Sequence, residues 1–64
     1  MKVNGKEIYL ETITTVSELL GKLNLNEEKV VVWVNGENIC IERYSKHSLD
    51  EKDEIEIISI ISGG

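Results

Sequence analysis

The stretch VVVWVNGENICI, residues 30–41, has the pattern of two strands joined by a tight turn. Residues 30–35 are apolar at positions that face both sides of a strand, which is typical of an interior strand covered by a helix on at least one side. Asn35 and Gly36 both tolerate the positive φ angles that a type I′ hairpin turn requires. We therefore expect residues 30–35 to form the middle of a sheet and residues 37–41 to return as a shorter strand.

In the returning strand, Ile39 and Ile41 should point to the same face, because strand side chains alternate. Cys40 stands between them and is expected to be a small buried hydrophobic residue rather than a reactive thiol. It is the only cysteine of the chain. No internal disulfide can therefore form, as is typical of a protein from a reducing compartment.

A second Asn-Gly pair, Asn4 and Gly5, predicts another hairpin at the start of the chain. Residues 1–11 should accordingly form two antiparallel strands. Ile8 and Leu10 alternate with polar or charged neighbours, which indicates a sheet with one face in water.

The segment after this hairpin predicts one amphipathic helix. Thr15 and Glu18 have the spacing of a capping box, which satisfies backbone amides at a helix start. Four apolar residues then share one helix face: Val16, Leu19, Leu20 and Leu23. Asn24 tolerates the left-handed conformation in which helices end. Gly21 in the helix interior has no explanation from the sequence beyond close packing.

Residues 43–50 are polar and predict a loop with at most one helical turn, anchored by Leu49, and residues 51–53 predict a turn. The last strand follows. In it Ile55 and Ile57 alternate with two glutamates, Glu54 and Glu56.

Beyond Ile57 the apolar positions shift to Ile58, Ile60 and Ile61. Without a bulge, Ile58 and Ile60 point to the face opposite Ile55 and Ile57. Three outcomes are open from the sequence: a strand buried on both faces, an exposed apolar patch, or a bulge that resets the register.

The order of these elements predicts an α+β protein with the ubiquitin-like β-grasp fold, in which a mixed sheet of four or five strands packs on one helix. With 64 residues, the chain has room for one domain, 1–64, with a flexible tail at about 61–64.

The composition argues against several classes of partner. The net charge of −5 opposes binding to nucleic acid or anionic lipid, so partners should present basic surface. The longest apolar run is far shorter than a membrane-spanning helix, and no signal sequence is recognisable. We expect a soluble cytoplasmic protein.

Candidate catalytic groups are few. His47 is the only histidine and lies in a polar stretch, so we interpret it as a loop residue rather than a ligand or base. The acidic residues of 50–56 lack the spacing of a calcium loop and indicate a solvated face that could steer a basic partner. No role is assigned to Cys40, His47 or Arg43, and we expect no metal site.

The chain ends in Gly63 and Gly64, two residues without a side chain. Such a tail is thin enough to thread a narrow channel, and residues 61–64 fully extended span roughly 14 Å. The terminal carboxylate is ionised at neutral pH and is a poor electrophile. It must be activated before it reacts, and the ATP chemistry for this has to come from a partner enzyme.

Together these features resemble the thiamine-biosynthesis sulfur-carrier family over essentially the whole chain. Residues 16–20, VSELL, resemble the family's helix, and residues 32–37, VWVNGE, resemble its inner strand and turn. Residues 49–57, with Gly63 and Gly64, resemble its closing strand and tail.

The resemblance implies a sulfur carrier that is not itself an enzyme and binds no cofactor. An adenylyltransferase of the ubiquitin-activating type would adenylate Gly64 with ATP and magnesium. A cysteine desulfurase or another persulfide donor would supply sulfur for a thiocarboxylate, which thiazole synthase would consume. Gly63 would belong to the tail, and Ile58, Ile60 and Ile61 to the surface that docks on these partners.

Three alternatives remain open at this point. The molybdopterin-synthase small subunit has a similar fold and tail. A ubiquitin-like modifier would join Gly64 to lysine side chains. A plain interaction domain would have an inert tail.

Overall fold

The computed structural model describes residues 1–9, 13 and 15–60. The elements in chain order are β1 (Lys2–Val3), β2 (Lys6–Glu7), α1 (Val16–Lys22), the 3-10 helix η1 (Glu27–Lys29), β3 (Val30–Val34), β4 (Glu37–Ile39), the 3-10 helix η2 (Ile41–Arg43) and β5 (Glu54–Ser59). The strands form one five-stranded sheet in the order β2-β1-β5-β3-β4. Strand β1 runs parallel to β5, and the other neighbours are antiparallel.

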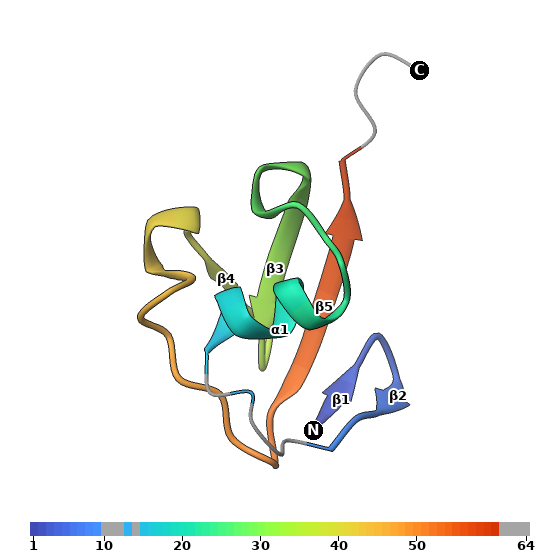
Figure 1. Cartoon of the computed structure of the whole chain (residues 1–64). Helices are drawn as coiled ribbons and strands as arrows, with labels where there is room; N and C mark the ends of the chain where they lie inside the picture. Colours follow the sequence, from blue (N-terminus) through green and yellow to red (C-terminus); the bar gives the residue numbers. More distant parts are fainter. Residues whose placement is uncertain (10–12, 14, 61–64) are drawn as a thin grey trace.

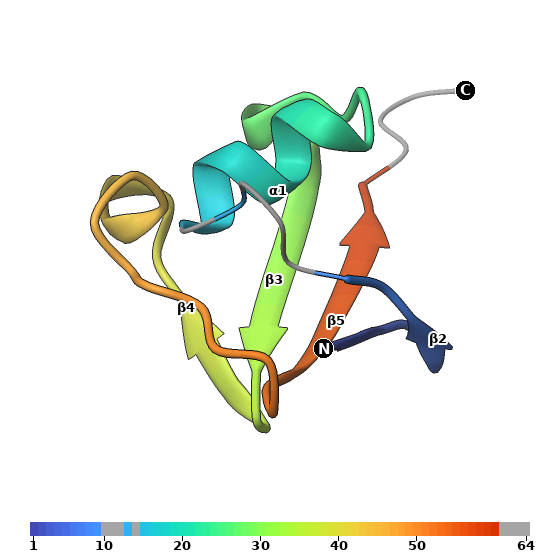
Figure 2. The same cartoon turned by 60° about the horizontal axis from the view of Figure 1, so that its bottom comes forward.

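A mixed five-stranded sheet with one α-helix across it is the β-grasp arrangement that the sequence predicts (Figure 1). Figure 2 shows α1 lying across one face of the sheet. The core fills the space between them. Among the residues that the structure describes, thirteen buried side chains form it: Met1, Val3, Ile13, Val16, Leu19, Leu20, Val30, Val32, Val34, Ile39, Tyr44, Ile55 and Ile57.

Both predicted Asn-Gly turns are confirmed. Asn4 and Gly5 have φ angles of 52° and 84°, and Asn35 and Gly36 have φ angles of 53° and 83°. Glycine and asparagine adopt this left-handed region more readily than other residues, which explains why the chain reverses here. The first hairpin is shorter than expected for residues 1–11, because its pairing ends at Glu7. Residues 10 and 11 lie outside the described residues.

The helix begins as predicted. The amide of Glu18 donates to the Thr15 hydroxyl over 3.3 Å, and the Thr15 amide donates to the Glu18 carboxylate over 3.1 Å. Val16, Leu19 and Leu20 are buried against the sheet. The helix ends at Lys22, two residues before Asn24, which has a φ of 58° and confirms the predicted left-handed end.

The prediction that residues 30–35 form the middle of the sheet is wrong. Strand β3 is interior, with β5 on one side and β4 on the other, but β5 is the third of the five strands. The burial of β3 alternates, with Val30, Val32 and Val34 buried and the residues between them half-buried. The helix therefore covers one face of β3, and the apolar residues on its other face belong to a different surface.

The prediction for the returning strand is also wrong at its end. Strand β4 stops at Ile39, which is buried, and the chain then turns into η2. Ile41 is consequently 44% exposed instead of facing the core with Ile39. Cys40 is exposed rather than buried, because it lies at the start of η2 and not inside a strand.

The loop that follows β4 is held by two side chains. Leu49 packs against the core as predicted. Tyr44, which the sequence did not single out, is almost completely buried, and its carbonyl accepts a hydrogen bond of 2.9 Å from the amide of Ser17 in α1. The loop is thereby fixed to the first turn of the helix.

Candidate functional site

Strand β5 carries the shift in apolar positions, and it does so without a bulge. Its register with β3 is continuous from the pair Val34 and Ile55 to the pair Val30 and Ser59. Ile55 and Ile57 therefore face the core, while Ile58 and Ile60 fall on the face away from α1. Of the three outcomes open from the sequence, the structure has the exposed apolar patch.

We call this surface the outer patch and define it as Val31, Trp33, Ile58 and Ile60. Ile58 is 53% exposed and Ile60 is 48% exposed. Val31 lies directly opposite Ile58 in the sheet, and both Val31 and Trp33 are half-buried. The sequence analysis did not single out Val31 and Trp33, because it expected the helix to cover at least one face of this strand and did not decide which residues lie on the other face.

Next to the outer patch the same face of β5 becomes acidic. Glu54 and Glu56 are exposed on it, and Glu56 lies opposite Trp33. Lys2 stands opposite Glu54 on β1. An open groove of about 690 Å³ runs beside these residues between the two Asn-Gly turns. The face thus combines an apolar half with a mainly acidic half, which suits a partner with apolar and basic groups.

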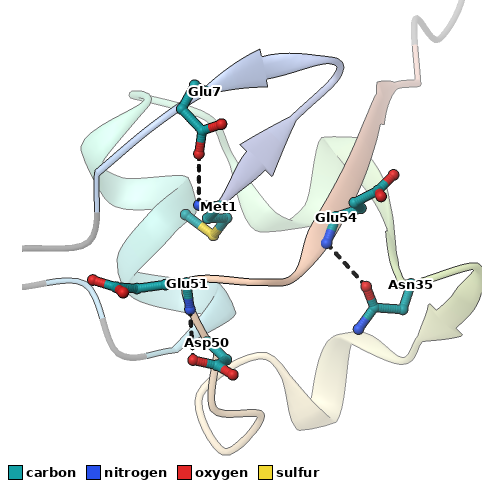
Figure 3. Close-up of polar contacts among 6 residues, drawn as sticks. All are labelled: Met1, Glu7, Asn35, Asp50, Glu51 and Glu54. Atoms are coloured by element: carbon teal, nitrogen blue, oxygen red, sulfur yellow. Dashed lines mark hydrogen bonds and ion pairs between the residues drawn. The ribbon is translucent and has the colours of Figure 1, made fainter.

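The position of β5 is set by two asparagine side chains. On one side, the Asn4 carboxamide donates to the Ile57 carbonyl over 3.1 Å and accepts from the Ile57 amide over 2.8 Å. On the other side, the Asn35 carboxamide oxygen accepts from the Glu54 amide over 2.9 Å (Figure 3). Both asparagines come from turns, so each turn also holds the strand.

The acidic segment before β5 is partly structural. The Asp53 carboxylate accepts from the Asn35 carboxamide over 2.9 Å and from the Asp50 amide over 2.8 Å. The Asp50 carboxylate in turn accepts from the Glu51 amide over 2.7 Å (Figure 3). These contacts close the predicted turn at residues 51–53, while Glu54 and Glu56 remain exposed.

Two further titratable residues, Tyr44 and His47, lie in the loop between β4 and β5. His47 is half-buried, and its carbonyl accepts from the amide of Val16 over 3.2 Å, which makes it part of the loop that holds the helix. Burial raises the pKa of the Tyr44 phenol, and the carboxylate of Glu27 raises it further. Across the described residues, no group of three histidine, cysteine or acidic side chains is placed to hold a metal ion. In the same part of the chain, no helix is long and apolar enough to cross a membrane.

Some of the predicted site residues lie on the outer patch, and the others lie outside the described residues. Ile58 and Ile60 lie together on the outer patch at the end of β5. The amide of Ile60 donates to the Lys29 carbonyl over 2.7 Å, so the pairing with the chain before β3 continues to that position. Ile61, Gly63 and Gly64 lie outside the described residues.

The fold and this face define a small β-grasp protein whose last strand presents an apolar surface just before the C-terminal residues. Comparison with known proteins shows the family to which the chain belongs. The family model described as the ThiS family matches residues 1–64. The chain belongs to the ThiS family, the sulfur carriers of thiamine biosynthesis.

Individual relatives agree with this assignment. The sulfur carrier protein ThiS of Bacillus subtilis (strain 168) is 35% identical over 65 residues, covering 100% of this chain and 98% of that protein. A segment of a thiazole synthase from Paramagnetospirillum magneticum is 34% identical over 62 residues. That match covers 97% of this chain, but the chain spans only 19% of the length of that protein.

Solved structures show the same fold. The crystal structure of the thiamine biosynthesis protein ThiS from Geobacter metallireducens matches with a TM-score of 0.81 and 30% identity, covering 98% of this chain and 96% of that one. A solution structure of a thiamine biosynthesis protein from the same organism matches with a TM-score of 0.78, also at 30% identity, and 85% of it is covered.

Proposed function

We propose that this chain carries sulfur on its C-terminal carboxylate, at Gly64, as a co-substrate of partner enzymes. An adenylyltransferase of the ubiquitin-activating type uses ATP and magnesium to convert the carboxylate to an acyl adenylate. The outer sulfur of a persulfide, provided by a cysteine desulfurase or another donor, displaces AMP and forms an acyl disulfide. A thiol then attacks the donor's sulfur, which breaks the S–S bond, releases the thiocarboxylate and leaves a disulfide on the donor. Thiazole synthase then takes up the sulfur. The observation that carries this proposal is membership of the ThiS family over residues 1–64.

The chemistry of the terminus supports this order of steps. A carboxylate is ionised at neutral pH, and its negative charge repels a nucleophile. Adenylation removes that charge and provides AMP as a leaving group. Gly63 and Gly64 have no side chains, so the last residues can enter a narrow active site.

The outer patch is the surface that we assign to docking on the adenylyltransferase. Exposed apolar patches on small soluble proteins commonly mark interaction sites. Ile58 and Ile60 lie four to six positions before Gly64, so a partner that covers them has the carboxylate within reach. The predicted docking residue Ile61 continues the same segment. Glu54 and Glu56 beside the patch favour a partner with basic groups.

Thiazole synthase is the proposed acceptor of the sulfur. A protein named thiazole synthase contains a segment similar to this chain, which supports a working relation between the two activities. The need for ATP and the single unpaired cysteine both fit a cytoplasmic location.

The proposal is tested by incubating the purified chain with its adenylyltransferase, ATP and magnesium. We expect ATP–pyrophosphate exchange that depends on the chain. With a persulfide donor and a thiol reductant added, the intact mass should rise by the difference between one sulfur and one oxygen atom. Deletion of Gly64 should abolish both signals, because it shortens the reach of the carboxylate by one residue. It should leave the thermal unfolding temperature unchanged, since a glycine has no side chain to bury in a core.

A variant with one alanine added after Gly64 is the matched control, because it keeps both glycines but moves the carboxylate. It should also lose exchange. Exchange that persists in both variants would contradict the role of Gly64. Conjugates joined to lysine side chains, found by mass spectrometry in cells, would instead support a protein modifier.

A further inference from the structure

The backbone groups of β5 alternate between its two neighbours. The carbonyl of Glu54 accepts from the amide of Asn35 over 2.7 Å, and the amide of Ile60 donates to the carbonyl of Lys29 over 2.7 Å. The backbone amides and carbonyls of even-numbered residues therefore point toward β3. The carbonyl of Ile55 accepts from the Asn4 amide over 2.9 Å on the opposite side. The backbone amides and carbonyls of odd-numbered residues therefore point toward the β1 side.

Strand β1 ends before it has covered this side of β5. Its pairing stops at Val3 opposite Ile55, where the chain turns away. The Asn4 carboxamide then takes the place of the missing strand, because it binds both the amide and the carbonyl of Ile57. The side chain of a turn residue thus extends the ladder by one position.

Ser59 is the next residue of β5 that faces this side. It is exposed, and within the described part of the chain no backbone or side-chain group lies in hydrogen-bond contact with its amide or carbonyl there. An unpaired strand edge with both a donor and an acceptor free is a template for another strand. Strand β5 therefore has an open edge directly beyond the Asn4 side chain.

We propose that this edge, at Ser59, is a β-augmentation site that pairs with an extended segment of the adenylyltransferase. The inference rests on the proposed function. Main-chain pairing of this kind supplies affinity, and side chains on the two faces supply specificity. Ile58 and Ile60 flank Ser59 and belong to the outer patch, so a segment that pairs here also lies against that patch.

The pairing would also set the register of the carboxylate in the partner. Strand pairing fixes position to a single residue, since a slip by one residue exchanges the faces of all side chains. Gly64 lies five residues after Ser59, within roughly 17 Å if the chain is fully extended. A fixed Ser59 thus limits where the carboxylate can lie.

The substitution Ser59→Pro tests this proposal, because it removes the Ser59 amide proton and leaves the amides that face β3 in place. Proline is tolerated on a strand edge whose N–H faces solvent, and it keeps the preceding residue extended. We expect the KM for the chain in ATP–pyrophosphate exchange to rise on the order of tenfold. The Ile60 amide should stay protected from hydrogen exchange.

Ser59→Val is the matched control, because it changes the side chain and keeps the amide proton. Its KM should stay within about twofold of the unaltered chain. If Ser59→Pro does not fold, a chemically synthesised chain with an N-methyl group at Ser59 removes the same proton without the proline ring and should show the same rise.

Equal KM values for the unaltered chain and the amide-blocked variants would overturn the proposal. So would an equal rise for Ser59→Val, which would assign the effect to the side chain. An amide-blocked variant that only converts a dimer to a monomer in sedimentation would show that a second copy occupies the edge. No exchange with the unaltered chain would contradict the carrier function itself, so the two proposals fail in different ways.

Discussion

The backbone conformation requires glycine at some positions of this chain and not at others. Gly5 and Gly36 have positive φ angles, and a side chain there would be strained. Gly21 has no such angle, and a Cβ atom built on it meets nothing within 4 Å. Close packing, the only explanation that the sequence offered for Gly21, is therefore wrong.

We expect Gly21→Ala to raise the free energy of unfolding by about 0.5–1 kcal/mol, because alanine loses less conformational freedom in a helix. Urea denaturation measures this change. Gly36→Ala, at a φ of 83°, is the control and should lower the stability. A destabilising effect of Gly21→Ala would show that the exposed position has a constraint beyond the helix itself.

Tyr44 makes the free energy of unfolding depend on pH in the alkaline range. Burial, with a further contribution from Glu27, raises its pKa above the ordinary value of 10.0, so the folded state favours the neutral phenol. The stabilisation is complete below about pH 10, the pKa in the unfolded chain, and is lost as the pH rises toward the higher pKa of the folded state. Denaturation midpoints measured between about pH 8 and about pH 11 should fall at the upper end. In Tyr44→Phe this part of the decline should disappear, and an unchanged decline would assign it to other groups.

Among the elements, the first hairpin has a role beyond its own two strands. Asn4 provides the left-handed turn and also binds both backbone groups of Ile57. The hairpin turn is therefore tied to the strand that leads to the C-terminal residues. Asn35 joins the second hairpin to the start of the same strand.

Asn4→Gly separates the two roles, because glycine keeps the left-handed turn and removes the carboxamide. We expect the free energy of unfolding to fall by roughly 1–2 kcal/mol, from two lost hydrogen bonds to the backbone of the buried Ile57. The Ile57 amide should exchange faster with solvent. Asn24→Gly is the matched control, since Asn24 also has a positive φ but its side chain makes no hydrogen bond within the described residues. Equal effects of the two substitutions would contradict a specific role for the Asn4 side chain.

On the scale of the whole molecule, β5 contributes side chains both to the core and to the outer patch. Ile57 is 8% exposed and packs in the core, while its neighbour Ile58 is 53% exposed on the outer patch. Two adjacent isoleucines thus place one side chain in the core and the other on the surface that we propose for docking.

We expect Ile57→Ala to lower the free energy of unfolding by about 2–4 kcal/mol through the cavity that it leaves. Ile58→Ala should lower it by about 0.5 kcal/mol or less and should instead raise the KM for the chain in the adenylyltransferase reaction. Urea denaturation and ATP–pyrophosphate exchange measure the two effects. A strongly destabilised Ile58→Ala with an unchanged KM would show that the outer patch belongs to the fold rather than to docking.

Local patterns in the sequence determined the elements of this protein. The two Asn-Gly turns, the capping box of Thr15 and Glu18, and the apolar face of α1 all depend on residues close in the chain, so sequence spacing is enough to predict them. The family resemblance depended on the same segments and on Gly63 and Gly64, and the match over residues 1–64 confirms it.

Only the tertiary structure decided which strand is central, where the second hairpin ends and which face of β3 is covered. These depend on pairing between distant segments: β5 enters between β1 and β3, and Tyr44 secures the loop that takes Ile41 and Cys40 out of the sheet. The outer patch has the same origin, because Val31 and Ile58 become neighbours only through the β3–β5 register. Periodicity in a sequence shows which residues share a face of a strand. Which of the two faces is buried depends on an element that a remote part of the chain contributes.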